Sequence, residues 1–294
     1  MPEDQLVDRA FLEKLERLTI QWHQSFPGLV GGRKSSRYAG PGQEFLDHRH
    51  FHLGDDLRAV NWRAYLRLEK LFLKMFRVEP HIPLRVMLDT SRSMITGSAP
   101  KFDYAKRLAA ALSYVGLVRL DTTILQPFSD GLGDHFACGG GRHRFAPAVQ
   151  FLQGLRAEGR TSYFQVARQF VSKFLQRGLL IIISDFLDDA DCCKALQYLA
   201  DFGHELLILH VWADEDRTPP WEGQLELTDA ETGARLELEF DAQARDRYTA
   251  AFDAYARELN QVALRNDGRY VGLSASMPVE DAIFGPLARA RGVG

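Results

Sequence analysis

After Leu84, short apolar segments alternate with longer amphipathic segments, and this alternation limits the possible folds more than any other feature of the sequence. The apolar segments have the length of strands and cover residues 84–88, 122–128, 179–184, 205–212 and 269–273. Apolar residues recur at helical spacing over residues 102–120, 147–155, 163–175, 191–202 and 242–265, and a last helix begins at Pro278. Apolar strands separated by helices predict a mostly parallel sheet with helices on both faces. The expected fold class is therefore doubly wound α/β.

One stretch interrupts this pattern. Apolar and polar residues alternate over residues 225–228 and again over 235–240, on either side of the turn-forming segment 229–233. This predicts a β-hairpin inserted into the α/β region near residues 222–240.

The first 83 residues follow a different plan. Residues 3–26 predict an amphipathic helix whose apolar stripe includes Phe11, Leu15 and Trp22, and either the rest of the protein or a partner must cover that stripe. A segment rich in Gly, Arg and Lys follows over residues 28–42, and strand-like segments at 44–52 and 71–78 predict a small β-rich subdomain. We therefore divide the chain into residues 1–83 and 84–294.

Charge and hydropathy exclude several classes of function. The chain has 294 residues, with 36 Lys and Arg against 39 Asp and Glu and a net charge of −3, so its overall charge does not attract nucleic acid or anionic membranes. No apolar run approaches the roughly 18 residues that cross a bilayer, and the first residues lack the pattern of a secretory signal. We expect a cytoplasmic protein without a membrane span. Residues 28–77 are locally basic and aromatic, which leaves nucleic-acid binding as a weaker hypothesis.

Oxygen-bearing side chains follow the ends of the predicted strands. Asp89, Ser91 and Ser93 form a DxSxS pattern directly after the first strand of the α/β region, Asp185 follows the strand 179–184, and Thr161 lies in the loop before a helix. The carboxyl ends of parallel strands meet at one edge of the sheet, where ligands usually bind. Carboxylates and hydroxyls are the ligands that Mg²⁺ and Mn²⁺ prefer.

These motifs resemble the metal-ion-dependent adhesion site of von Willebrand factor A domains. The upstream run GQEFLDHRHFHLGDDLRAVNWRAYLRLEKLFLKMFRVEP, with its Gly-Asp-Asp turn at 54–56, resembles the signature that precedes such a domain in domain-of-unknown-function family 58. The later runs LTDAETGARLELEF and RDRYTAAFDAYARELN resemble the hairpin and the following helix of that family. The resemblance covers roughly residues 38 to 280.

The resemblance implies a site and a function. Asp89, Ser91, Ser93, Thr161 and Asp185 would bind Mg²⁺ or Mn²⁺, and an acidic side chain from a protein partner would complete the coordination. Arg160 stands where the family usually has Gly, and Arg92 lies between the two serines, so two cationic side chains would flank the metal. The family is associated with MoxR-type AAA+ ATPases, which implies a non-enzymatic adaptor or scaffold in protein maturation or remodelling.

Enzymatic alternatives use the same residues. A metal-dependent phosphatase or hydrolase of the haloacid-dehalogenase type would also place an Asp after a strand, but it needs a second Asp two residues later, where this chain has Ser91. A Ser/His/Asp hydrolase lacks the GxSxG elbow. Alternating histidines at 48, 50 and 52 predict an exposed strand face, and the three cysteines (Cys138, Cys192 and Cys193) predict neither a disulfide framework nor a zinc site.

Overall fold

A computed structural model describes residues 6–18, 39–52, 60–77, 83–118, 122–187 and 191–290. The chain forms two compact units. The larger unit comprises Met1–Gln24 and Ile82–Gly294, and the smaller unit is Ser25–His81. Along the described residues, no helix combines the length and the apolar character needed to cross a bilayer.

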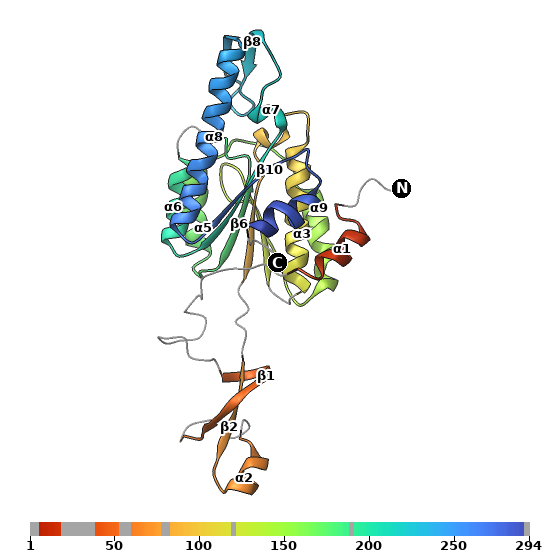
Figure 1. Ribbon diagram of the computed structural model, residues 1–294, viewed down its shortest axis with the longest axis vertical. Coiled ribbons are helices and arrows are strands. Elements are labelled where there is room, and N and C mark those ends of the chain that lie inside the picture. The colour runs from red at the N-terminus through yellow and green to blue at the C-terminus, as the bar shows by residue number, and fades with distance from the viewer. Residues whose placement is uncertain are drawn as a thin grey trace. The chain divides into compact units, whose positions relative to one another are not determined.

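A six-stranded sheet forms the centre of the larger unit (Figure 1). Its strands, in spatial order, are β10 (Arg269–Ser274), β7 (Glu205–Trp212), β6 (Leu179–Ser184), β3 (Leu84–Asp89), β4 (Thr123–Phe128) and β5 (Phe136–Cys138). All neighbours pair in parallel except β5, which lies antiparallel at the edge beside β4. The predicted strands are all present, whereas β5 is an addition that the sequence did not predict.

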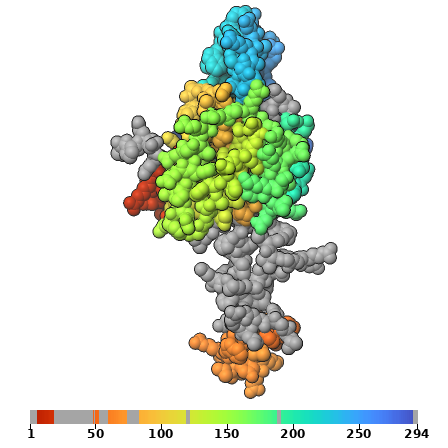
Figure 2. All heavy atoms as spheres, turned by 180° about the vertical axis from the view of Figure 1, so that it is seen from behind, coloured from red at the N-terminus to blue at the C-terminus, as the bar shows by residue number. Residues whose placement is uncertain are grey.

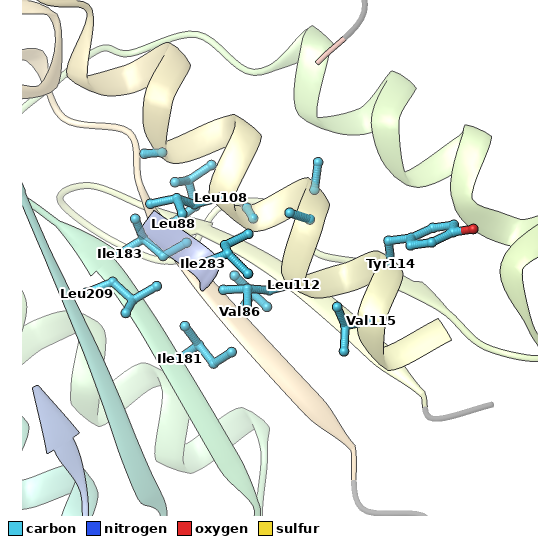
Figure 3. Close-up of a cluster of buried hydrophobic side chains, with 14 of the residues drawn as sticks. Val86, Leu88, Leu108, Leu112, Tyr114, Val115, Ile181, Ile183, Leu209 and Ile283 are labelled. Carbon is cyan, nitrogen blue, oxygen red and sulfur yellow. The ribbon is translucent and has the colours of Figure 1, made fainter. Parts of the chain in front are cut away.

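Helices cover both faces of this sheet. Successive side chains of a strand point to opposite sides, so each apolar strand presents apolar residues to both faces. In β6, Ile181 and Ile183 belong to one buried cluster and Leu180 and Ile182 to another. The first cluster, part of which is drawn in Figure 3, lies under α1 (Arg9–Leu15), α3 (Lys101–Val118), α4 (Phe145–Gly154) and the C-terminal helical segment that begins with α9 (Val279–Ala282). The second lies under α5 (Tyr163–Lys173), α6 (Cys192–Asp201) and α8 (Ala242–Arg265). The predicted doubly wound α/β class is confirmed.

The strand order reverses direction between β3 and β6. From β3 the chain continues to β4 and β5 on one side, and from β6 it continues to β7 and β10 on the other. Such a reversal opens a crevice at the carboxyl ends of the two central strands, which is where doubly wound sheets bind ligands. Here those strands end at Asp89 and Ser184, the residue before Asp185.

The N-terminal helix α1 packs on the body of the larger unit. Asp8 caps it by accepting a hydrogen bond of 2.7 Å from the Phe11 amide, and Phe11 and Leu15 are buried beside α3. Just past the helix, Glu16 accepts a hydrogen bond of 2.9 Å from the Tyr114 hydroxyl of α3. Of the two possibilities that the sequence left open, the rest of the protein covers the apolar stripe at these residues, while Trp22 lies outside the described residues. Because of this packing, α1 belongs with residues 82–294 rather than with the β-rich subdomain to which the sequence division assigned it.

The predicted hairpin is present as β8 (Gly223–Thr228) and β9 (Arg235–Phe240). The two strands form a sheet of their own and do not join the six-stranded sheet. Figure 2 shows this hairpin, in light blue, projecting from the rest of the larger unit.

The smaller unit contains an antiparallel pair, β1 (Ala39–His50) and β2 (Phe72–Arg77), and the helix α2 (Trp62–Leu68). The β-rich prediction is confirmed, but the sequence analysis missed α2, which Asn61 caps by accepting from the Ala64 amide at 3.3 Å. His48 and His50 are exposed as predicted, and each packs its ring against Phe72. Residues 28–38 and the turn at 54–56 lie outside the described residues.

Candidate metal-binding site

The DxSxS turn begins where β3 ends. Asp89 is the last residue of the strand, and one of its carboxylate oxygens, Oδ1, accepts a hydrogen bond of 2.8 Å from the Ser91 amide. This side-chain-to-backbone bond turns the chain sharply, as Asp commonly does. A short 3₁₀ helix, Arg92–Ile95, follows and carries Ser93 back toward the strand end. The hydrogen bonds of these residues form the turn itself. The DxSxS pattern therefore brings three oxygen-bearing side chains close together.

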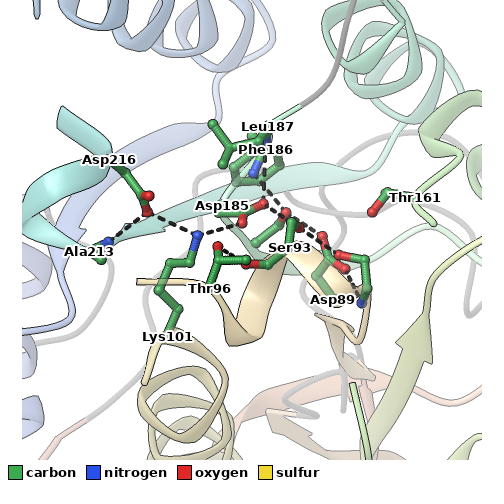
Figure 4. A network of polar contacts seen from close by, with 12 residues as sticks. Asp89, Ser93, Thr96, Lys101, Thr161, Asp185, Phe186, Leu187, Ala213 and Asp216 are labelled. Atoms are coloured by element: carbon green, nitrogen blue, oxygen red, sulfur yellow. Dashed lines mark hydrogen bonds and ion pairs between the residues drawn. The ribbon is translucent and has the colours of Figure 1, made fainter. Parts of the chain in front are cut away.

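A chain of hydrogen bonds joins this turn to the end of β6 (Figure 4). The hydroxyl oxygens of Ser91 and Ser93 lie 2.9 Å apart, and the Ser93 hydroxyl donates to Oδ1 of Asp185 at 3.3 Å. Asp89, Ser91, Ser93 and Asp185 are all buried. The structure thus brings together four of the five residues that the sequence singled out.

The fifth residue, Thr161, lies in a loop held against the turn. The Glu158 amide donates to the Thr90 carbonyl at 2.7 Å, and the Arg92 amide donates to the Gly159 carbonyl at 3.1 Å. Gly159 has φ +84°, a conformation that L side chains rarely adopt, so this tight turn favours glycine. The hydrogen bonds of Thr161 do not reach the other four residues; its amide and hydroxyl donate to Glu231 at the hairpin tip, at 3.0 and 3.3 Å.

Two residues that the sequence analysis missed orient Asp89. The Ser184 hydroxyl donates to Oδ2 of Asp89 at 2.6 Å, and the Tyr163 hydroxyl donates to the same oxygen at 3.3 Å. Both side chains are buried. Ser184 could have been noticed, because it precedes Asp185 at the end of a predicted strand.

A buried lysine lies beside the site. Lys101, at the start of α3, is 0% exposed, and its Nζ lies 2.9 Å from Oδ2 of Asp185 and 2.9 Å from Oδ2 of Asp216. Asp216 belongs to α7 (Asp214–Arg217) and also accepts from the Ala213 amide at 2.9 Å. Oδ2 of Asp185 thus pairs with the ammonium, while Oδ1 faces Ser93. No sequence motif indicated Lys101 or Asp216.

The electrostatics of the site follow from burial. Burial, together with a smaller effect of the negative charge of Asp185, raises the pKa of Asp89 to about 7, and the hydrogen bond from the Ser184 hydroxyl opposes this shift. Burial would lower the pKa of Lys101, but Asp185 and Asp216 outweigh this and raise it. With Asp89, Asp185 and Asp216 ionised, the single ammonium of Lys101 leaves the site with an excess of two negative charges. Arg92 and Arg160, which we expected to flank the site, have exposed side chains.

The donor set fits a hard divalent cation. Every candidate ligand is a carboxylate or hydroxyl oxygen, which Mg²⁺ and Mn²⁺ prefer. The raised pKa of Asp89 marks a buried carboxylate whose charge is poorly compensated, and a cation would relieve this. Within the described parts of the chain, no group of three or more His, Cys, Asp and Glu side chains could hold a metal ion, so hydroxyls would have to supply part of the coordination.

Solved structures and curated proteins show similarity to this chain. BatB from Bacteroides thetaiotaomicron is 20% identical with a TM-score of 0.44, over 71% of this chain and 98% of that chain. The SpRpn10 VWA domain is 13% identical with a TM-score of 0.39, over 69% of this chain and 93% of its own. The uncharacterized proteins Rv1480 of Mycobacterium tuberculosis and Mb1516 of Mycobacterium bovis are each 26% identical over 263 residues, which is 86% of this chain and 81% of each relative.

The doubly wound sheet, with a DxSxS turn after its first strand, is the arrangement that the resemblance to von Willebrand factor A domains predicted. The family model described as "Protein of unknown function DUF58" matches residues 47–258, well over half of the sequence. The chain therefore belongs to the DUF58 family.

Proposed function

We propose that this protein is a non-enzymatic, metal-dependent protein-binding module. Asp89, Ser91, Ser93 and Asp185, together with Thr161 from the neighbouring loop, would hold Mg²⁺ or Mn²⁺. An acidic side chain of a partner would complete the coordination. The observation that supports this most directly is the buried chain of carboxylates and hydroxyls at the point where the strand order reverses.

Each residue has a distinct part in this proposal. Asp89 and Asp185 provide negative charge, and the hydroxyls provide neutral oxygens, so a bound divalent ion keeps positive character toward a partner. Ser184 and Tyr163 fix the orientation of Asp89 through its Oδ2. Lys101 pairs with Oδ2 of Asp185 and so limits the negative charge of the site.

Binding is favoured over catalysis by the chemistry around Asp89. A phosphatase of the kind considered above needs an acid two residues after its nucleophilic Asp, and Ser91 at that position shares a hydrogen bond with Ser93. A hydroxyl in such a network is a poor proton donor to a leaving group. The metal-dependent hydrolase remains the alternative that the experiments below must exclude.

The family resemblance suggests the class of partner. A MoxR-type AAA+ ATPase would present the acidic side chain, and the protein would act as its adaptor or scaffold in protein maturation or remodelling. This part of the proposal depends on the resemblance alone.

Titration calorimetry tests the metal site. Wild-type protein should bind Mg²⁺ or Mn²⁺, and Asp89→Asn should abolish binding while the far-ultraviolet circular dichroism spectrum stays the same. Asp130→Asn, the same change at an exposed position, is the matched control and should bind like wild type. Binding by Asp89→Asn with unchanged affinity would contradict the proposal.

Two further measurements address partner and catalysis. Proteins captured from the native host should include an AAA+ ATPase that is lost with EDTA or with Thr161→Ala. A generic phosphate ester should not be hydrolysed in the presence of Mg²⁺. Turnover that Asp89→Asn eliminates would favour the enzymatic alternative.

A further inference from the structure

The tip of the inserted hairpin is an ordered turn that contacts the Thr161 loop. The Asp229 amide donates to the Ala234 carbonyl at 2.8 Å, and the Gly233 amide donates to the Asp229 carbonyl at 2.9 Å. The Asp229 carboxylate also accepts from the amides of Glu231 and Thr232, at 2.9 and 2.6 Å. These bonds fix the backbone on which Glu231 is presented.

Glu231 uses both of its carboxylate oxygens on one residue of the candidate site. Oε2 accepts from the Thr161 amide at 3.0 Å, and Oε1 accepts from the Thr161 hydroxyl at 3.3 Å. Next to it, Nε of Arg160 donates to the Glu231 carbonyl at 3.1 Å. The hairpin tip is thus attached to the loop that carries the fifth candidate ligand.

Among the residues that the structure describes, few other contacts attach the hairpin tip to the body. The hairpin forms its own sheet, and most of its side chains are exposed, including Leu227 and Leu236. The ion pair between Arg235 and Glu226 lies within the hairpin itself. The tip is therefore held by a few polar contacts that another carboxylate could replace, without unpacking a hydrophobic core.

The position of Glu231 is the position that an acidic partner needs. In the proposed function, on which this inference rests, a partner carboxylate approaches the oxygen cluster beside Thr161. A partner carboxylate that coordinates an ion held by Thr161 must approach the same hydroxyl that Glu231 contacts at 3.3 Å, and the like charges of the two carboxylates repel. We propose that Glu231 is an internal acidic ligand of the Thr161 loop, which a protein partner must displace in order to bind.

The contact itself is tested without metal. In the full-length protein, Glu231→Gln should increase hydrogen–deuterium exchange in residues 159–163 and 229–234, because a neutral amide binds Thr161 less strongly than a carboxylate does. Glu237→Gln is the matched control: it makes the same change on an exposed strand of the same hairpin and should leave exchange in these segments unchanged. Equal exchange in wild type and Glu231→Gln would overturn the inference.

Displacement is tested with a defined probe. The probe is a fluorescein-labelled peptide with the sequence of residues 226–237, closed into a hairpin by a disulfide between two added terminal cysteines. In MgCl₂, Glu231→Gln protein should bind it about tenfold more tightly than wild type or Glu237→Gln, because the internal competitor is lost. A probe in which only the residue corresponding to Glu231 is replaced by Gln should lose this difference. Equal binding by wild type and Glu231→Gln would overturn the inference.

The outcomes separate this inference from the proposed function. If the tenfold difference persists in EDTA, Glu231 occupies the Thr161 loop but the metal-dependent function is wrong. If wild type binds Mg²⁺ in calorimetry and Glu231→Gln changes neither exchange nor probe binding, the metal site stands and the internal ligand does not.

Discussion

Replacing Lys101 with Met should destabilise the metal-free protein and strengthen metal binding. Met keeps the unbranched apolar length of the side chain but removes the ammonium that lies 2.9 Å from both Asp185 and Asp216. Removing one partner of a buried ion pair costs about 3–5 kcal/mol of stability. Because the Asp216 side chain is 15% exposed and can be partly hydrated, we expect about 3 kcal/mol. For a domain of this size that corresponds to a fall in Tm of about 6–12 °C.

Divalent ions should reverse part of this loss. The ammonium and a bound cation both neutralise Asp185, and at an effective dielectric constant of about 20 their repulsion amounts to a few kcal/mol. Lys101→Met should therefore bind Mg²⁺ at least about tenfold more tightly, a gain of roughly 1.4 kcal/mol. Thermal melts with and without MgCl₂, combined with calorimetry, measure both effects. Lys106→Met on the same helix, whose lysine pairs with Asp103 instead, is the control.

The reasoning about Lys101 has two points of failure. If Lys101→Met is as stable as wild type without metal, the ammonium does not compensate buried charge. If its affinity for Mg²⁺ is equal or lower, Lys101 does not compete with a cation at Asp185.

Three other predictions follow from burial and charge. Since the pKa of Asp89 is raised to about 7, mainly by burial, Mg²⁺ affinity should reach its maximum above pH 7 and fall about tenfold per pH unit below it. Equal affinities at pH 8 and pH 6 in calorimetry would contradict this. Burial lowers the pKa of His210 to about 3, below its unfolded value of about 6.5, so the free energy of unfolding should decrease as pH falls from 6.5 toward 3, by up to about 1.4 kcal/mol per unit. Urea denaturation should show this slope reduced in His210→Phe. Because Phe11 and Leu15 are buried, Leu15→Ala should lower the free energy of unfolding by about 2–5 kcal/mol, and deleting residues 1–26 should lower the Tm. A truncated protein as stable as the full chain would mean that α1 contributes nothing to the core.

The fold was predictable wherever an element had a strong and sufficiently long pattern. The expected bounds of β6, β7 and α8 are those of the structure, because a run of apolar residues or a long amphipathic repeat leaves few alternatives. The misses are short: β5 has three residues, α7 has four and α2 has seven. An element of that length contains too few residues to show a clear apolar repeat, and it forms only when the surrounding fold supports it.

The site divides in the same way. Asp89, Ser91, Ser93 and Asp185 could be predicted to meet, because each follows a strand whose end the sequence placed at the same edge of the sheet. A fully buried Lys101 could not be predicted, since lysine in an amphipathic segment ordinarily faces solvent and becomes tolerable inside only when carboxylates from distant elements surround it.

Lys101 and Glu231 act on the same site with opposite charges. One compensates Asp185 when no cation is present, and the other occupies the Thr161 loop when no partner is present. A divalent ion adds positive charge near both, so it weakens the need for Lys101 and strengthens the attraction for Glu231. By thermodynamic linkage, an ion that tightens the internal ligand is itself held more tightly by it. A partner carboxylate must then compete with a tethered one whose effective concentration is of the order of millimolar. A single acidic side chain does not win that competition at cellular protein concentrations, so a true partner must add contacts outside the oxygen cluster, and those contacts rather than the metal would determine which acidic protein is selected.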